Sequence, residues 1–162
     1  ALRHPARADA VAAQLAAYAT VTRRSKGEDP NGIYISDTLG EMGLLYSAIK
    51  SVVIGGSFTV GGHNPIEPAQ LGCAIICGPL MYNFTAIVAA FDQQQALLHS
   101  ADENGIADAL AALLRDSAHR AALGSRAQKV CAAEAESLPR LWQALAPWRA
   151  AVASGAPLKA VA

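Results

Sequence analysis

Short apolar stretches that alternate with helix-like segments are the feature that most restricts the fold of this chain. Four of them, at 33–35, 51–54, 73–77 and 96–99, are rich in β-branched or other apolar residues, as buried parallel strands are. Each is followed by a turn signal and then by apolar residues at helical spacing. This repetition predicts an α/β fold, a Rossmann-like parallel sheet wrapped by helices. Such a sheet places its strand-to-helix turns at the carboxyl edge, where ligands bind.

Apolar residues spaced three and four apart predict the buried helix faces. The predicted faces are Leu44, Leu45, Ala48 and Ile49; Ile87, Val88 and Phe91; and Ile106, Leu110, Leu113 and Leu114. An Ala-rich segment predicts a further helix over 7–18. The segment 102–148 is predicted to be wholly helical, with breaks near Ser117 and Pro139. The C-terminal end is therefore expected to be helical.

Composition and charge exclude several classes of protein. Lys plus Arg and Asp plus Glu both number 13, so the chain lacks the positive field of a dedicated nucleic-acid-binding protein. Three cysteines form no CxxC pair, and the four histidines lack ligand spacing, so no structural metal is predicted. No apolar run reaches the roughly 18 to 20 residues that span a bilayer. We expect one domain over 1–150, lacking its first strands, and a flexible tail over 151–162.

A glycine-rich run after the second predicted strand is the densest cluster of unusual residues. Four glycines within eight residues, 55–62, are tolerated where the main chain turns sharply or a ligand approaches closely. Gly56 and Gly61 have the spacing of a phosphate loop. Gly62 and His63, however, stand where that loop requires Lys and Ser or Thr, so a P-loop is excluded.

The residues that follow predict a helix that begins at the ligand edge. Asn64 can cap it, Pro65 suits its first position, and Glu67 lies three residues after the cap. In one interpretation Glu67 completes a capping box by accepting a hydrogen bond from the Asn64 amide. In the other, Glu67 faces the crevice and accepts hydrogen bonds from two sugar hydroxyls. The sequence leaves both interpretations open.

A second polar segment, 36–41, closes the first predicted strand and opens a helix. Asp37 or Thr38 can serve as simple caps, and Glu41 can favour the positive end of the helix. The alternative is that the free amides of this helix start bind a phosphate or carboxylate. Arg3, at a strand end, is either solvated or a clamp for an anionic oxygen.

Together these segments resemble the 3-deoxy-D-manno-octulosonic acid (Kdo) transferases of lipopolysaccharide synthesis. The motifs that carry the resemblance are Arg3-His4-Pro5, Ser36-Asp37-Thr38-Leu39-Gly40-Glu41, Leu44-Leu45-Tyr46, Gly55-Gly56-Ser57, Gly61-Gly62-His63-Asn64-Pro65-Ile66-Glu67-Pro68 and Gly78-Pro79 with Asn83-Phe84. Their order and spacing agree over about residues 1 to 135. The family has two Rossmann-like domains facing a cleft, the GT-B arrangement, and this chain is similar to the C-terminal, donor-binding one.

The resemblance implies transfer of Kdo from CMP-Kdo to a lipid A precursor, with inversion and without a cofactor. No Asp-x-Asp-type pair is present in the sequence, so no requirement for a divalent metal is predicted. The resemblance also implies a protein on the cytoplasmic face of the inner membrane of a Gram-negative bacterium, in contact with the membrane surface. The family's catalytic base lies in the other domain, so this chain is expected to bind the donor without catalysing transfer. By position, the implied CMP- and donor-binding residues are Leu2, Arg3, Leu39, Gly40, Glu41, Asn64, Pro65, Ile66 and Glu67, with Ser57 and His63 as further donor contacts.

Three departures from the family pattern bear on the donor. Leu2 replaces the usual Pro, Leu39 replaces a common Met, and the stretch 57–61 is about one residue short and lacks a Pro or basic residue. The short loop is expected to alter how the Kdo carboxylate is received. Two alternatives stay open: a GT-B glycosyltransferase domain that uses a UDP-sugar, and a non-catalytic nucleotide-binding or interaction module.

Overall fold

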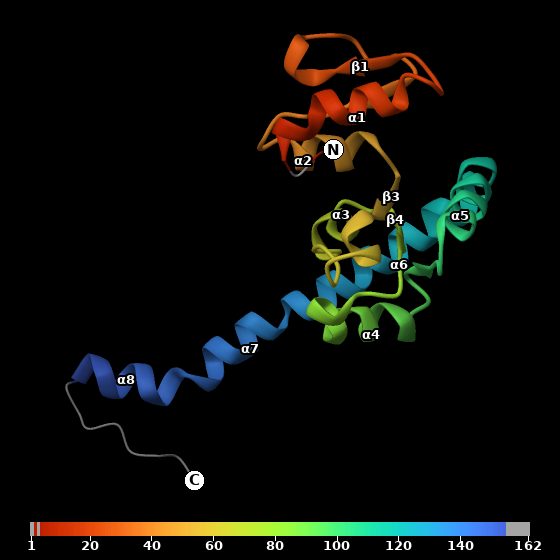
Figure 1. The fold of residues 1–162 in the computed structure, drawn as a ribbon. Helices are drawn as coiled ribbons and strands as arrows, with labels where there is room; N and C mark the ends of the chain where they lie inside the picture. Colours follow the sequence, from red (N-terminus) through yellow and green to blue (C-terminus); the bar gives the residue numbers. More distant parts are fainter. Residues whose placement is uncertain (1, 3, 155–162) are drawn as a thin grey trace. The chain divides into compact units, whose positions relative to one another are not determined.

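The computed structural model describes residue 2 and residues 4–154, apart from the side chains of residues 137 and 138. The chain forms two compact units, residues 1–48 and 49–162, which we call the first and second units (Figure 1). All pairs of hydrogen-bonded strands in the described part are parallel, and they form one sheet of two strands and one of three.

The first unit has a two-stranded parallel sheet. Its elements are η1 (Pro5–Arg7), α1 (Ala8–Leu15), β1 (Val21–Arg23), η2 (Arg24–Lys26), β2 (Ile33–Ile35) and α2 (Met42–Ala48). Val21 pairs with Ile33, and the register continues to the end of both strands. The return from η2 to β2 is tight: a Cβ at Gly32, whose φ is +62°, would overlap the Thr20 carbonyl. Only glycine therefore fits this turn without strain.

The second unit carries the three-stranded sheet in the order β3-β4-β5. Its elements are β3 (Ser51–Ile54), η3 (Gly55–Phe58), α3 (Ile66–Gln70), β4 (Ala74–Cys77), η4 (Tyr82–Phe84), α4 (Thr85–Gln93), β5 (Leu98–His99), α5 (Glu103–Arg115), α6 (Ser117–Ala135), α7 (Ser137–Ala144) and α8 (Ala146–Ser154). The central strand, β4, is buried along its whole length. This burial explains why its sequence is continuously apolar rather than alternating.

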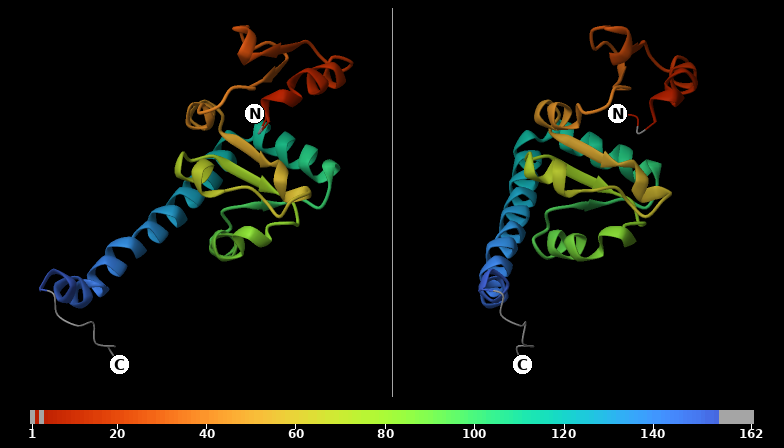
Figure 2. Two further views of the ribbon diagram at one scale, coloured as in Figure 1. Left: turned by 60° about the vertical axis from the view of Figure 1, so that its left-hand side comes forward. Right: turned by 90° about the vertical axis from the view of Figure 1, so that its left-hand side faces the viewer.

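Helices cover both faces of this sheet (Figure 2). Ile75 and Cys77 of β4 pack in one cluster with residues of α3, α4 and α6, including the fully buried Phe91. Ala74 and Ile76 point the other way and pack against Leu113 of α5 and Leu123 of α6. Because successive strand residues face opposite sides, one short strand supplies both cores.

The predicted α/β fold of parallel strands and helices is confirmed. Strands 33–35 and 51–54 have the predicted bounds, while the later two are shorter than predicted, at 74–77 and 98–99. The prediction missed β1, because Val21-Thr22-Arg23 has a single apolar residue and resembles a loop. The break near Ser117 is confirmed: Asp116 ends α5, and its carboxylate caps α6 by accepting from the His119 amide at 2.8 Å.

Two predicted helix faces are partly wrong. In α2 no residue is buried, and Leu44 is 64% exposed, while Ile49, just beyond the helix, is 49% exposed. In α5 two adjacent residues of the predicted face differ: Leu113 is fully buried, whereas Leu114 is 70% exposed. Adjacent helical residues point about 100° apart, so only one of this pair can face the sheet.

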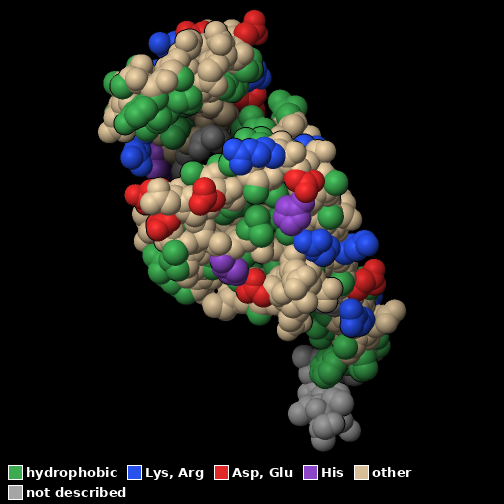
Figure 3. Space-filling model, turned by 90° about the vertical axis from the view of Figure 1, so that its right-hand side faces the viewer, with side chains coloured by type: hydrophobic (Ala, Val, Ile, Leu, Met, Phe, Trp, Pro, Cys, Tyr) green, Lys and Arg blue, Asp and Glu red, His purple; other side chains and the backbone are tan. Residues whose placement is uncertain are grey.

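The C-terminal helices expose apolar side chains. Leu141 and Trp142 of α7 and Val152 of α8 are more than half exposed, and hydrophobic side chains gather at this end of the described chain (Figure 3). Residues 151–154, expected to begin a flexible tail, continue α8, and residues 155–162 lie outside the described part. Among the described residues, no helix combines the length and the apolar character that a membrane crossing requires.

Candidate functional site

The loop at 36–41, which follows β2, carries the first group of predicted site residues. Asp37 lies within it, and its side chain is only 1% exposed. One carboxylate oxygen accepts from the Ser25 amide at 2.8 Å, and the other accepts from the Ser25 hydroxyl at 2.7 Å. Arg23 adds hydrogen bonds from Nε at 2.9 Å and from its Nη2 at 2.8 Å. Asp37 is therefore a saturated structural anchor for the loop.

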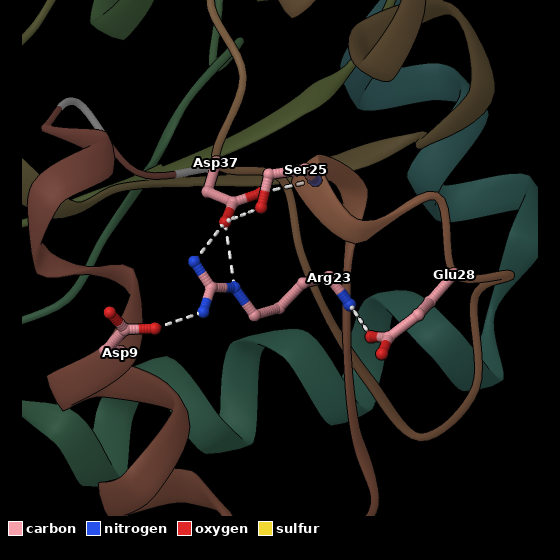
Figure 4. A network of polar contacts seen from close by, with 5 residues as sticks. All are labelled: Asp9, Arg23, Ser25, Glu28 and Asp37. Atoms are coloured by element: carbon pink, nitrogen blue, oxygen red, sulfur yellow. Dashed lines mark hydrogen bonds and ion pairs between the residues drawn. The ribbon is translucent and has the colours of Figure 1, made fainter.

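Arg23 is the centre of this network, which Figure 4 shows. Its guanidinium contacts Asp37 and also the carboxylate of Asp9 on α1, while its backbone amide donates to Glu28 at 2.8 Å. Hydrogen bonds from Ser25 and Arg23 lower the pKa of Asp37 to about 2, although burial opposes the shift. The network ties α1, β1 and the loop after β2 together through charged groups that are fully paired.

Glu41, at the other end of the loop, is held by Arg24. The Arg24 guanidinium donates to Glu41 Oε1 from Nε at 3.0 Å and from Nη2 at 2.6 Å. The Thr38 hydroxyl donates to Oε2 of the same carboxylate. These contacts, with Arg24 the larger cause, lower the pKa of Glu41, and Glu41 in turn raises the pKa of Arg24. Glu41 is thus an ionised, oriented side chain.

The remaining predicted residues of the first unit lie beside this loop. Leu39 is 77% exposed, and Gly40 is exposed with a φ of +83°, a left-handed conformation that favours glycine. The Leu2 amide donates to the Ser36 carbonyl at 2.9 Å, which joins the start of the chain to the loop. Arg3, which the resemblance implies for phosphate binding, lies outside the described residues.

In the second unit, the glycine-rich turn after β3 packs against the loop after β4. Ser57 is fully buried between them, and its hydroxyl donates to the Ile54 carbonyl and accepts from the Gly78 amide at 2.6 Å. The Ser57 carbonyl also accepts from the Leu80 amide at 2.8 Å. The resemblance implies that Ser57 contacts the donor sugar nucleotide, and this stays a prediction. In the structure its hydroxyl has no exposed surface and links the two loops.

Close packing explains the glycines of this turn. A Cβ at Gly61 would overlap the ring of Tyr82, and one at Gly62 would press on the sulfur of Met81. Both glycines have a positive φ, +85° and +93°. A Cβ at Gly56 would lie 2.7 Å from the His63 ring, so the imidazole rests directly on the turn. The glycines thus serve packing between the two loops, which brings His63 beside the end of β3.

The predicted helix after His63 is short and starts later than expected. α3 begins at Ile66. The Ile66 amide donates to the side-chain oxygen of Asn64 at 3.0 Å, which is the bond of an Asx turn. Pro65 is fully buried. Glu67 is exposed, and among the described residues it makes no hydrogen bond or ion pair. The capping box between Glu67 and Asn64 is therefore absent, and sugar binding by Glu67 stays a prediction.

The predicted site residues thus fall into two groups. Leu2, Leu39, Gly40 and Glu41 belong to the first unit, and Ser57, His63 and Asn64 to Glu67 belong to the second. Sequence reasoning missed the turn Arg23-Arg24-Ser25, whose side chains hold both ends of the 37–41 loop. The consecutive arginines were the available signal. Within the described ranges, no cluster of three or more His, Cys, Asp or Glu residues is placed to hold a metal ion.

Comparisons with known proteins identify relatives along most of the chain. A 3-deoxy-D-manno-octulosonic acid transferase of Bordetella pertussis is 37% identical over 152 residues, which cover 90% of this chain. One of Haemophilus influenzae is 34% identical over 155 residues. The chain spans 36% of the length of each of these relatives. No protein-family model matches the chain.

A solved structure is similar to the fold as well as the sequence. It is the crystal structure of the C-terminal CMP-Kdo binding domain of WaaA from Acinetobacter baumannii, with 32% identity and a TM-score of 0.74. The match covers 79% of this chain and 69% of that one. The chain therefore belongs to the 3-deoxy-D-manno-octulosonic acid transferase family and corresponds to the C-terminal domain of its members.

Proposed function

We propose that this chain is the donor-binding part of a Kdo transferase and that it holds CMP-Kdo. The observation that carries the proposal is its similarity, at 32% identity and a TM-score of 0.74, to a domain whose name states CMP-Kdo binding. The parent enzyme would transfer Kdo to a lipid A precursor with inversion, releasing CMP. A catalytic base in the partner domain would deprotonate the acceptor hydroxyl, so the chain alone binds without transferring.

The proposed nucleotide contacts are the residues that the family resemblance implies. Leu2, Arg3 and the amides of 39–41 would bind the phosphate, and the segment Asn64-Pro65-Ile66 would frame the nucleoside, with the buried Pro65 fixing its main chain. Glu67 would accept hydrogen bonds from the ribose hydroxyls. What supports this role is that Glu67 is exposed and has no protein partner in the described part, whereas Asp37 and Glu41 are paired.

The wider setting is proposed on the same basis. The enzyme would work at the cytoplasmic face of the inner membrane of a Gram-negative bacterium, where a lipid acceptor is available at the membrane surface. No cofactor or metal is proposed, because the sequence has no Asp-x-Asp-type pair and because helix amides with Arg3 would neutralise the leaving phosphate.

Calorimetric titration of the folded chain with CMP, and with UMP and UDP as controls, tests the proposal. We expect selective binding of CMP that EDTA does not change. Equal or tighter binding of UMP and UDP would instead favour a UDP-sugar donor. No binding by a folded chain would refute the claim that this chain holds the donor by itself.

A matched pair of variants tests Glu67. We expect Glu67→Ala to weaken CMP binding by about 1.5 to 3 kcal/mol, roughly 10- to 150-fold, the scale of hydrogen bonds to a charged group. The control is Glu103→Ala, which removes another exposed carboxylate from the first turn of a helix in the same unit. Unchanged CMP affinity in Glu67→Ala would exclude the ribose contact.

A further inference from the structure

Three consecutive residues of the first unit, Arg23, Arg24 and Ser25, hold the 37–41 loop at both ends. Arg23 and Ser25 bind Asp37 at the start of the loop, and Arg24 binds Glu41 at its end. Gly40, with its positive φ, lies between these two fixed points. The Arg23-Arg24-Ser25 turn therefore fixes the 37–41 loop at both of its ends.

The two ion pairs that hold the loop, Arg23 with Asp37 and Arg24 with Glu41, differ in exposure to solvent. The Asp37 and Arg23 side chains are 1% and 13% exposed, so a ligand cannot reach the pair without opening the fold. The Glu41 and Arg24 side chains are 26% and 48% exposed. The pair of Arg23 and Asp37, which we call the inner pair, is thus a structural anchor. The pair of Arg24 and Glu41, which we call the outer pair, lies at the surface, where a ligand can approach.

Charge gives the outer pair a more specific role. In the proposed function the 39–41 loop receives an anionic nucleotide, and an unpaired carboxylate at that position would repel it. Arg24 donates to Glu41 through both Nε and Nη2, the forked geometry in which a guanidinium both orients and neutralises a carboxylate. The Thr38 hydroxyl fixes the second carboxylate oxygen.

We propose that Arg24 is a positioning residue that holds and neutralises Glu41, so that the 37–41 loop accepts the phosphate of an anionic nucleotide. The inference rests on the proposed function, because it assumes that this loop meets the donor. It predicts that Arg24 acts through Glu41 and not through direct contact with the phosphate.

A double-mutant cycle on the full chain separates these two routes. CMP affinity is measured for the wild type, Arg24→Gln, Glu41→Gln and the double variant, and cytidine, which lacks the phosphate, is measured by displacement of CMP. We expect Arg24→Gln to weaken CMP binding about threefold to tenfold, the range of partly exposed charge pairs. Cytidine binding should change less than CMP binding. In the Glu41→Gln background the same substitution should change CMP binding by less than about twofold.

The control is Lys26→Gln, which removes the same charge from the same turn but breaks no side-chain hydrogen bond or ion pair among the described residues. It should leave CMP affinity within about twofold of the wild type, because it breaks no pair. If Arg24→Gln fails to fold, Arg24→Met, which also removes the charge but keeps an unbranched side chain, replaces it in the cycle, and restoration by Glu41→Gln remains the criterion.

Three results would overturn the inference about Arg24. They are equal losses for CMP and cytidine, a loss that persists in the double variant, and a loss in Lys26→Gln as large as in Arg24→Gln. If the wild type itself does not bind CMP, the proposed function fails, and the inference about Arg24 fails with it.

Discussion

Replacing Ser57 with Ala tests whether this residue holds the fold or contacts the donor. The substitution removes the acceptor of the buried Gly78 amide and the donor to the Ile54 carbonyl. A buried amide left without a partner costs about 1 to 3 kcal/mol. For a unit of this size, that cost corresponds to a fall in melting temperature of about 4 to 12 °C.

Ser51, in the neighbouring strand β3, provides a matched control. Its hydroxyl oxygen is buried and lacks a hydrogen-bond partner among the described residues. Ser51→Ala deletes the same atoms without orphaning another group, so it should leave stability unchanged or raise it slightly. The two variants differ in hydrogen bonding and not in the chemical change.

The assay is thermal denaturation followed by CMP titration of the folded variants at a temperature below both transitions. We expect Ser57→Ala to melt well below Ser51→Ala and to bind CMP with an affinity within about threefold of the wild type, since its hydroxyl has no exposed surface. Equal melting temperatures would refute the structural role. A tenfold loss of CMP affinity in a folded Ser57→Ala would instead indicate that Ser57 contacts the donor nucleotide.

Two further predictions concern the turns and the charges of the site. Gly61→Ala should lower the free energy of unfolding in urea by about 2 kcal/mol or more, from left-handed strain and overlap with Tyr82. Gly72→Ala, with a similar φ but its nearest atom 4.0 Å away, should cost only the strain, and equal losses would contradict the packing argument. Asp37 has a folded pKa of about 2 against an ordinary value of 3.8, so its stabilisation is complete above pH 3.8 and is lost as pH falls towards 2. Asp37→Asn should therefore reduce the loss of stability of the first unit between pH 3.8 and 2, measured by unfolding at each pH. An unchanged loss of stability over that pH range would disprove that Asp37 causes it.

The sequence was sufficient for elements whose determinants are local. The strands at 33–35 and 51–54 are short runs of apolar and β-branched residues, and their bounds were predicted correctly. The break near Ser117 was also predicted, and the structure shows that it is local, because the side chain of Asp116 caps α6. Each of these signals lies within a few residues of the feature that it specifies.

The polar network of the first unit could not be predicted in this way. Arg23 and Asp37 are 14 residues apart, and Arg24 and Glu41 are 17 apart. Only the parallel pairing of β1 with β2 brings them together, and β1 itself was missed. A long-range ion pair forms only when the fold brings its partners together, so the contacts of the Arg-Arg-Ser turn become visible only in three dimensions.

Ser57 and Glu67 show why burial, and not residue type, decides between a structural and a functional role. Both are polar residues of one glycine- and proline-rich stretch, and the family resemblance implies donor binding for both. The fold encloses the Ser57 hydroxyl and uses both its donor and its acceptor capacity. It leaves Glu67 exposed, and at the start of α3 the Ile66 amide donates to the Asn64 side chain while the carboxylate of Glu67 accepts no bond in the described part. A carboxylate that is exposed and makes no bond at the start of its own helix is available to a ligand, which supports the proposed role of Glu67 in ribose binding.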